Sequence, residues 1–235
     1  MSRYLVHLTR DYDGELAQQN LVNILKEKII EARNSHCLVM HKLEQLEFSK
    51  LLKNKFRTVC FTETPLTQLK QLTSDIEDRK IKLKPYGIVF WKDNLFENGA
   101  SPAIYINAKG TSISRFLLDE FDLIFKKINT FKGLKEQEKS HYTNIVHYYS
   151  LINVVNEKHD FLWEREWRHH GNFKFKYQDI VAIIANTPSQ FEKLCERELS
   201  TRQYKFIEKI PIINPEWTYE KLVEELAIRI WEKLS

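Results

Sequence analysis

The stretch Phe161-Leu162-Trp163-Glu164-Arg165-Glu166-Trp167-Arg168-His169-His170 says most about the fold. As a strand it would carry its side chains in two alternating sets, with Trp163, Arg165 and Trp167 on one face and Glu164, Glu166 and Arg168 on the other. On a helix, Glu164 and Glu166 would point about 200° apart. The flanking tryptophans and the alternating segment Phe173–Tyr177 favour the strand. The sequence therefore predicts two carboxylates and a guanidinium on one face of a strand.

The composition is that of a globular protein. The chain has 235 residues, of which 43% are hydrophobic and 29% charged, so it is long enough to bury a sizeable core. Glycine and proline are scarce, at 6 residues each, which disfavours a turn-rich sandwich or barrel. We therefore expect a single α+β domain over residues 1–235.

Charge and apolar patterning limit the partners that the sequence predicts. The 36 basic and 32 acidic residues are nearly balanced and the basic runs are short, which favours a solvated surface over a phosphate-binding patch. No apolar run approaches the length of a membrane span, and the sequence shows no signal peptide. We expect a cytoplasmic protein with no membrane partner.

Metal binding is not expected. The three cysteines lie in unrelated contexts and show no metal-ligand or disulfide spacing, which indicates buried free thiols: Cys37, Cys60 and Cys195. Two further groupings, His36 with Cys37 and His41, and His169 with His170, also lack a recognised ligand spacing.

Periodicity along the chain predicts both classes of element. Strands are expected over 3–9, 57–62, 86–91, 102–106, 164–169, 173–177 and 180–185, with residues 102–106 as the antiparallel neighbour of 86–91 and an extended segment at 205–213. Helices are expected over 17–32, 43–52, 65–72, 115–131, 141–154 and 188–200, and residues 92–101 are expected to form a polar loop. A terminal helix is expected to start at Asn214-Pro215 or at Thr218 and to carry an apolar stripe from Tyr219 to Leu234. The fold class is α+β, a mixed and mainly antiparallel sheet flanked by helices, with a helical insertion at about 112–157.

Two short stretches carry candidate binding residues. His7 and Thr9 share a face of the first strand, where they can hydrogen-bond a ribose hydroxyl or a carboxamide, although a structural histidine is the alternative. Thr62 leaves a strand just before a helix that Thr64 can cap, with Pro65 at its first position. Helix N-termini attract anions, so this stretch can form the rim of a phosphate or pyrophosphate site, or simply end a strand and cap a helix.

The late glutamates allow two interpretations. Glu164, Glu166 and Arg168 can be a surface ion-pair ladder, which would contribute little to stability. The adjacent tryptophans imply partial burial, and buried charge is retained where it is paired or functional. This second interpretation makes Glu164, Glu166 and Arg168 a candidate functional site.

At these motifs the chain resembles the AbiGi family of abortive phage infection proteins, which belongs to bacterial defence systems. The resemblance rests on short motifs in a fixed order: His7–Thr9, Val59–Glu63 with Pro65 and Leu66, Tyr86 and Gly87 before an apolar strand, Pro102–Ile106, and Trp163–Arg168, whose sequence W-E-R-E-W-R is similar to the late W-x-E-x-E-W-R box of the family. It implies a defence protein and a possible protein partner from the same operon.

The order of a histidine, an aromatic strand and a late glutamate is also similar to that of ADP-ribosyltransferases, which use NAD. This resemblance implies that Glu166 holds the ribose on the nicotinamide side, Glu164 faces the acceptor and His7 contacts the other ribose. Tyr86 or Tyr105 would stack on nicotinamide. A carboxylate beside the ribose would stabilise the positive charge that develops as the glycosidic bond breaks. Thr9, Thr62 and Arg168 complete the candidate cofactor contacts.

Three functions therefore stay open. The first is an ADP-ribosyltransferase-like effector of antiphage defence, with NAD as cofactor and nucleic acid among its acceptors. The second is a non-catalytic antitoxin or interaction protein of a two-component system. The third is a protein that binds or cleaves nucleic acid, which requires the scattered basic residues to share one face.

Overall fold

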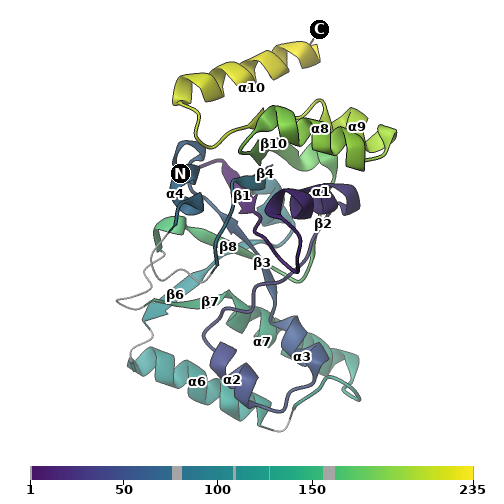
Figure 1. Ribbon diagram of the computed structural model, residues 1–235. Coiled ribbons are helices and arrows are strands. Elements are labelled where there is room, and N and C mark those ends of the chain that lie inside the picture. The colour runs from purple at the N-terminus through teal and green to yellow at the C-terminus, as the bar shows by residue number, and fades with distance from the viewer. Residues whose placement is uncertain (1, 76–80, 108–109, 127, 156–161, 235) are drawn as a thin grey trace. The chain divides into compact units, whose positions relative to one another are not determined.

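Figure 1 shows the computed structural model of the chain, which describes residues 2–75, 81–107, 110–126, 128–155 and 162–234. Two compact units are present. Unit 1 consists of Met1–Ile30, Phe61–Asn98 and Lys174–Ser235, and unit 2 of Glu31–Cys60 and Gly99–Phe173. Helices and a mixed, mainly antiparallel sheet confirm the α+β class. The single domain over residues 1–235 and the insertion at about 112–157 stay predictions.

Unit 1 is built on a sheet with the strand order β11-β10-β4-β1. β1 (Tyr4–Leu8) and β10 (Ile180–Ala185) each pair antiparallel with β4 (Tyr86–Trp91), whereas β11 (Ile212–Ile213) pairs parallel with β10. The apolar runs of β4 and β10 have the bounds expected from the sequence, because strands buried on both faces are apolar throughout. β3 (Thr58–Thr62) carries the chain from unit 2 into unit 1 and pairs with β1.

Gly87 permits the close pairing of β4 with β1. A Cβ at this position would collide with the backbone carbonyl oxygen of His7. Because backbone cannot move aside as a flexible side chain can, this register requires glycine.

Both faces of the unit 1 sheet carry helices. On one face, Val6, Leu8 and Val89 pack against leucines of α4 (Leu69–Thr73) and α10 (Tyr219–Leu234). The opposite face meets α1 (Ala17–Glu27) and α8 (Pro188–Glu198), and the ring of Phe191 on α8 lies 6.0 Å from that of Tyr86. The remaining elements of this part of the chain are short: β2 (Ile29–Ile30), η1 (Leu66–Gln68), α5 (Lys92–Glu97), β9 (Phe173–Lys174), η3 (Tyr177–Asp179) and α9 (Thr201–Ile207).

Unit 2 contains two small groups of strands. β3 lies beside β8 (Glu166–His170), which pairs antiparallel with β5 (Ser101–Pro102). β6 (Ile104–Asn107) and β7 (Ile152–Val155) form a separate parallel pair. These strands supply the polar cluster described below.

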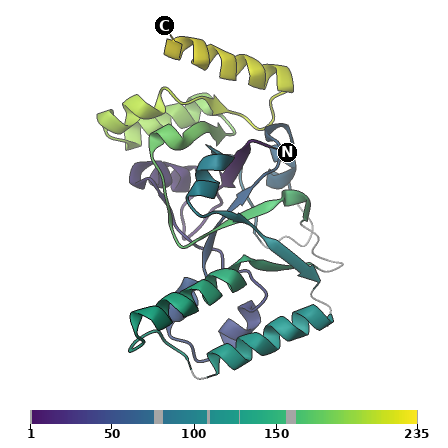
Figure 2. The same ribbon diagram turned by 180° about the vertical axis from the view of Figure 1, so that it is seen from behind.

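A helical layer completes unit 2. It consists of α2 (Met40–Gln45), α3 (Lys50–Lys55), α6 (Ser112–Phe125) and α7 (Glu136–Leu151), with the 3-10 turn η2 (Leu162–Glu164) preceding β8. α6 and α7 lie side by side in both views (Figure 1 and Figure 2), and the Tyr149 hydroxyl donates to the Leu117 carbonyl oxygen at 2.8 Å. Aromatic rings from α6, α7 and the residue that follows α3 form much of the core: Phe56, Phe121, Phe125 and Tyr149.

Several predicted pairings and elements were wrong. Pro102–Ile106 is not the neighbour of β4, because β5 pairs with β8 and β6 with β7. The expected polar loop at 92–101 contains α5, and the expected extended segment at 205–213 begins within α9. Ser200 accepts from the Gln203 backbone N–H in a capping box that starts α9.

Other helices are shorter than predicted. α1 ends where Lys28 adopts a left-handed conformation, and Ile29 and Ile30 then form β2. The helix expected over 43–52 is broken into α2 and α3 between residues 46 and 49. Thr64 does not cap through its side chain as expected, because η1 begins after Pro65 and the Thr64 hydroxyl lies 2.8 Å from that of Thr62.

The predicted strand around the late glutamates is only partly correct. β8 begins at Glu166, whereas Glu164 lies in the turn η2. Between them, Arg165 has a φ of 48°, in the left-handed region, so the backbone is not extended at this residue. The expected sharing of one face by Glu164 and Glu166 is therefore wrong, while Glu166 and Arg168 do share one.

Candidate functional site

Glu166 and Arg168 form a bidentate ion pair in unit 2. Arg168 donates from Nε to Glu166 Oε1 and from Nη2 to Oε2, both at 3.1 Å. The Arg168 side chain is 1% exposed and that of Glu166 13%. Two residues apart on β8, the side chains meet because alternation places them on the same face. The planar guanidinium fork matches the carboxylate, so the pair is geometrically specific as well as charged.

The β6–β7 pair supplies two more donors to the same carboxylate. Tyr105 on β6 and Asn153 on β7 are direct neighbours in the strand register. The Tyr105 hydroxyl and the Asn153 amide nitrogen each donate to Glu166 Oε2 at 3.0 Å. Glu166 therefore ties β8 to the β6–β7 pair through side chains.

Cys60 on β3 closes the cluster. Its thiol hydrogen-bonds the Glu166 carboxylate, and the Asn34 amide donates to Cys60 Sγ at 2.9 Å. Burial raises the pKa of Cys60, and the neighbouring charge of Glu166 raises it further. The group is therefore a neutral thiol donor rather than a thiolate nucleophile.

Arg168 also reaches the end of a helix. Its Nη1 donates to the Ser150 carbonyl oxygen at 2.7 Å, in the last turn of α7. The last carbonyls of a helix lack hydrogen-bond partners within the helix and carry partial negative charge. A buried guanidinium at this position supplies both a hydrogen-bond donor and a compensating positive charge. Arg168 thus joins β8 to α7.

The protonation states follow from these contacts. Burial alone would raise the pKa of Glu166, but the charge of Arg168 and the hydrogen bonds from Arg168, Cys60 and Tyr105 together lower it. Burial would likewise lower the pKa of Arg168, and the charge of Glu166 outweighs this effect. The pKa of Tyr105 is raised, first by burial and then by Glu166. The cluster therefore contains one carboxylate and one guanidinium, with neutral groups around them.

The hydrogen-bonding capacity of Glu166 is taken up within unit 2. Glu166 receives five hydrogen bonds, two from Arg168 and one each from Tyr105, Asn153 and Cys60. A carboxylate has about four lone-pair positions. Its capacity is thus filled by the protein, and the residues around Glu166 do not fit the ribose of a bound NAD.

Two of the other predicted site residues lie on β1 or just after it, in unit 1. His7 packs edge-on against Phe61 with ring centroids 5.9 Å apart. The Thr9 hydroxyl lies 3.0 Å from the carbonyl oxygens of both Ala17 and Tyr86, which share its one proton. Thr9 therefore joins the first strand to α1 and β4.

Thr62 and Tyr86 also belong to unit 1 and are held by local contacts. Thr62 accepts from the Thr64 backbone N–H at 3.1 Å. The pKa of Tyr86 is raised by burial. Of the predicted site residues, the structure therefore gathers Glu166, Arg168 and Tyr105 into one cluster.

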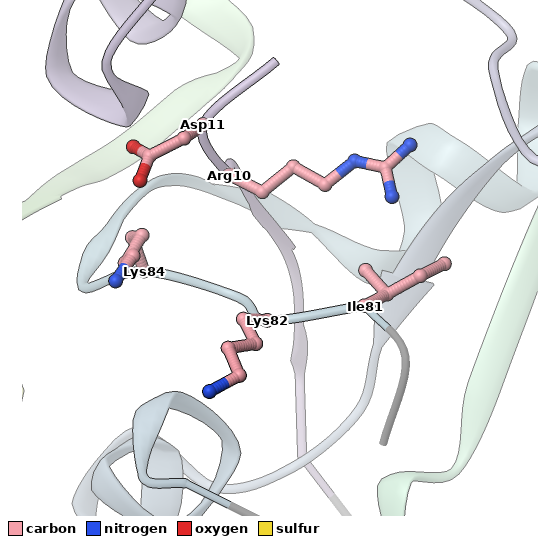
Figure 3. Close-up of a pocket in the computed structure, with 5 residues that line it drawn as sticks. All are labelled: Arg10, Asp11, Ile81, Lys82 and Lys84. Carbon is pink, nitrogen blue, oxygen red and sulfur yellow. The ribbon is translucent and has the colours of Figure 1, made fainter. Parts of the chain in front are cut away.

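A hollow in unit 1 is a second candidate. It has a volume of about 240 Å³ and is lined by Arg10, Asp11, Ile81, Lys82 and Lys84. Figure 3 shows the three basic side chains pointing in different directions rather than converging. Lys82 also pairs with Asp75 at 3.0 Å. The hollow therefore lacks the convergent charge of a phosphate site.

Sequence reasoning missed Asn34, Cys60, Ser150 and Asn153 as members of the cluster. They come from three separate stretches of the chain and carry no motif, so only the β6–β7 register and the course of β3 bring them together. It also missed an ion pair in unit 1, where the half-buried Lys92 lies 3.1 Å from the buried Glu63.

In the parts of the chain that the structure describes, no helix has both the length and the apolar character needed to cross a bilayer. Within the same residues, histidine, cysteine and carboxylate side chains do not gather in threes as a metal site would require.

The structure is that of an α+β protein with a buried, fully hydrogen-bonded Glu166–Arg168 ion pair in unit 2. Residues 24–216 match a family model described as "Putative abortive phage resistance protein AbiGi, antitoxin". The match covers well over half of the 235 residues, and the chain belongs to the AbiGi family. No curated protein and no solved structure matches the chain. The resemblance to ADP-ribosyltransferases thus receives no support from the comparisons.

Proposed function

We propose that the chain is the antitoxin of a two-component abortive infection system and counteracts a partner toxin of the same system without catalysis. The observation that carries this proposal is the family match over residues 24–216, whose description includes the word antitoxin. The matched region includes every residue of the Glu166 cluster, from Asn34 to Arg168. What the family shares therefore includes the segments that build this cluster.

The geometry of Glu166 favours a non-catalytic role. A carboxylate that stabilises a developing positive charge must direct lone pairs at the substrate. Glu166 instead accepts five hydrogen bonds from its own unit. The Arg168 guanidinium already compensates the negative charge of Glu166. This charge would therefore stabilise a positively charged transition state only weakly.

The other functions have weaker support. NAD binding, and with it ADP-ribosyl transfer, stays a prediction from the sequence that no contact in the structure favours. Nucleic acid as an acceptor or ligand also stays a prediction. Calorimetric titration with NAD tests the first of these, and retention on DNA or RNA with a steep salt dependence tests the second.

Growth of cells that express the partner toxin tests the proposal. The protein encoded beside this chain in its operon is expressed alone or with the chain, and we expect the chain to restore growth. A matched control is Phe121→Asp, which places a carboxylate at a fully buried core position and should unfold the chain. Persistent growth arrest in the presence of folded, wild-type chain would refute the proposal.

A further inference from the structure

The face of β8 that carries Glu166 and Arg168 ends in a third polar residue, His170. Residues 166, 168 and 170 lie on one side of the strand because side chains alternate along it. The His170 ring stacks on that of His147 in α7, with ring centroids 4.8 Å apart and planes inclined by 27°. Arg168 holds the carbonyl oxygen of Ser150, about one turn further along the same helix. Strand β8 therefore contacts the end of α7 through His170 as well as through Arg168.

Hydrogen bonding assigns the proton of the neutral His170 ring. Its Nε2 lies 2.6 Å from the Lys55 carbonyl oxygen, and because a carbonyl only accepts, Nε2 is the donor. The Nδ1 of the neutral ring is then unprotonated. A second proton on His170 would go to Nδ1 and give the ring a positive charge.

His147 is poorly placed to become charged. Its Nε2 is buried, and no group in the described part of the chain forms a hydrogen bond with it. Both nitrogens of a protonated imidazole are donors. Protonation of His147 would therefore leave a buried, unpaired N–H on a charged ring, which is unfavourable.

The charged and titratable groups that act on the two rings are basic. His169 of β8 acts on both rings, and the ammonium of Lys55 from α3 acts on His170. Among the described residues, no carboxylate forms an ion pair with either ring. A positive charge on the stack would thus be repelled by its neighbours rather than compensated.

Burial and these neighbours favour the neutral form of both rings. Burial lowers the pKa of His147 below its ordinary value of 6.5, and His169 lowers it further. Burial also lowers the pKa of His170, followed by the repulsion from His147, Lys55 and His169, and together these effects outweigh the hydrogen bond to the Lys55 carbonyl. Two neutral rings are therefore stacked at neutral pH.

We propose that the His147–His170 stack is an acid-sensitive clamp, which holds the end of α7 on β8 at neutral pH and loosens it in acid. The clamp is independent of the proposed function. When the contact opens, the rings enter water and bind protons more readily, so acid favours the open state.

The sign and the pH range of the effect follow from the same linkage. The stabilisation is complete above pH 6.5, the ordinary pKa of histidine, and is lost as pH falls toward the lower pKa of each ring in the closed state. This loss begins at a higher pH than that of Glu166, whose pKa is lowered from an ordinary value of 4.5.

Hydrogen exchange at the backbone amides of residues 148–151 measures opening at the end of α7. Protection factors, which correct for the intrinsic pH dependence of exchange, should fall in wild type between about pH 7.5 and 5.5. In His147→Phe the fall should be clearly smaller, because the phenyl ring keeps a stack and binds no proton. The matched control is His141→Phe, the same substitution at an exposed position of α7, which should keep the wild-type pH dependence.

The titration of His170, followed by NMR, gives a second readout. In wild type its midpoint should lie below pH 6.5, and in His147→Phe it should move upward, because a neighbouring positive charge has been removed. A ring that is merely packed beside His147 would keep its midpoint.

Wild-type protection that stays level over this range overturns the clamp, and so does an equal fall in wild type and His147→Phe. An equally large fall at the amides of α6 would mean that unit 2 opens as a whole in acid, which contradicts local release of α7. If circular dichroism shows that His147→Phe does not fold, the comparison of α7 with α6 in wild type and the wild-type titration of His170 still decide between these outcomes.

Discussion

At the scale of single residues, Glu166 links four strands of unit 2. Its carboxylate receives donors from β3, β6, β7 and β8, and its partner Arg168 also holds the end of α7. Such a cluster acts as a unit, because removing one charge leaves the other buried and uncompensated.

We expect Glu166→Gln to lower the free energy of unfolding by about 3–5 kcal/mol, the usual result of breaking a buried ion pair on one side. Urea unfolding followed by circular dichroism measures this loss. The double variant Glu166→Gln/Arg168→Met removes both charges and should recover most of the stability. A single variant as stable as wild type would show that the pair does not hold unit 2 together.

The pH dependence of stability has a defined sign at the same residue. The folded state lowers the pKa of Glu166 from its ordinary value of 4.5, so the unfolded chain binds the proton more readily. The stabilisation is therefore complete above pH 4.5 and is lost as pH falls toward the lower pKa of the folded state. Urea titrations between about pH 3 and 6 should show this acid-induced loss in wild type and a smaller one in Glu166→Gln/Arg168→Met. Equal losses in both proteins would assign the acid sensitivity to other groups.

At the scale of secondary-structure elements, helix ends show where local sequence decides and where it does not. α1 ends at Lys28, which adopts φ 54° and ψ 37° and donates its backbone N–H to the Ile24 carbonyl oxygen. Nothing in the apolar stripe of the sequence stops the helix there, and we predicted that it would continue to residue 32. The left-handed conformation that ends it is unfavourable for lysine and natural for glycine.

Lys28→Gly should therefore be more stable than Lys28→Ala by about 1–2 kcal/mol, because only glycine adopts the left-handed conformation without strain. The alanine variant is the matched control, since both substitutions remove the Lys28 ammonium, which lies 5.8 Å from the Tyr177 ring centroid. Urea unfolding of the pair measures the difference. Equal stability would mean that residue 28 carries no backbone strain.

The same scale shows which elements could be predicted. β4 and β10 were correct because a buried strand is an uninterrupted apolar run with sharp polar ends. The helix expected over 141–154 ends at Leu151 because Ile152–Val155 pairs with β6, and strand pairing outweighs a helical pattern in β-branched residues. Local periodicity holds no information about that partner strand.

At the scale of the whole molecule, the cluster joins segments that are far apart in the chain. The sequence predicted that Glu166 and Arg168 would share a face, since their spacing on a strand requires it. It could not predict Cys60 or Asn153 as partners, because those contacts depend on pairing between distant strands. The same limit explains why Glu166 was expected to face a substrate: a saturated carboxylate and an open one look alike in a sequence.

The most direct test of the account is toxin neutralisation by the Glu166→Gln/Arg168→Met variant. This protein lacks both charges of the cluster but should stay folded, as circular dichroism and urea unfolding would verify. If the chain acts as a non-catalytic antitoxin, the folded variant restores growth to toxin-expressing cells as wild type does. Loss of neutralisation in a variant that is folded and present at the wild-type level would contradict the account and return Glu166 to a catalytic role.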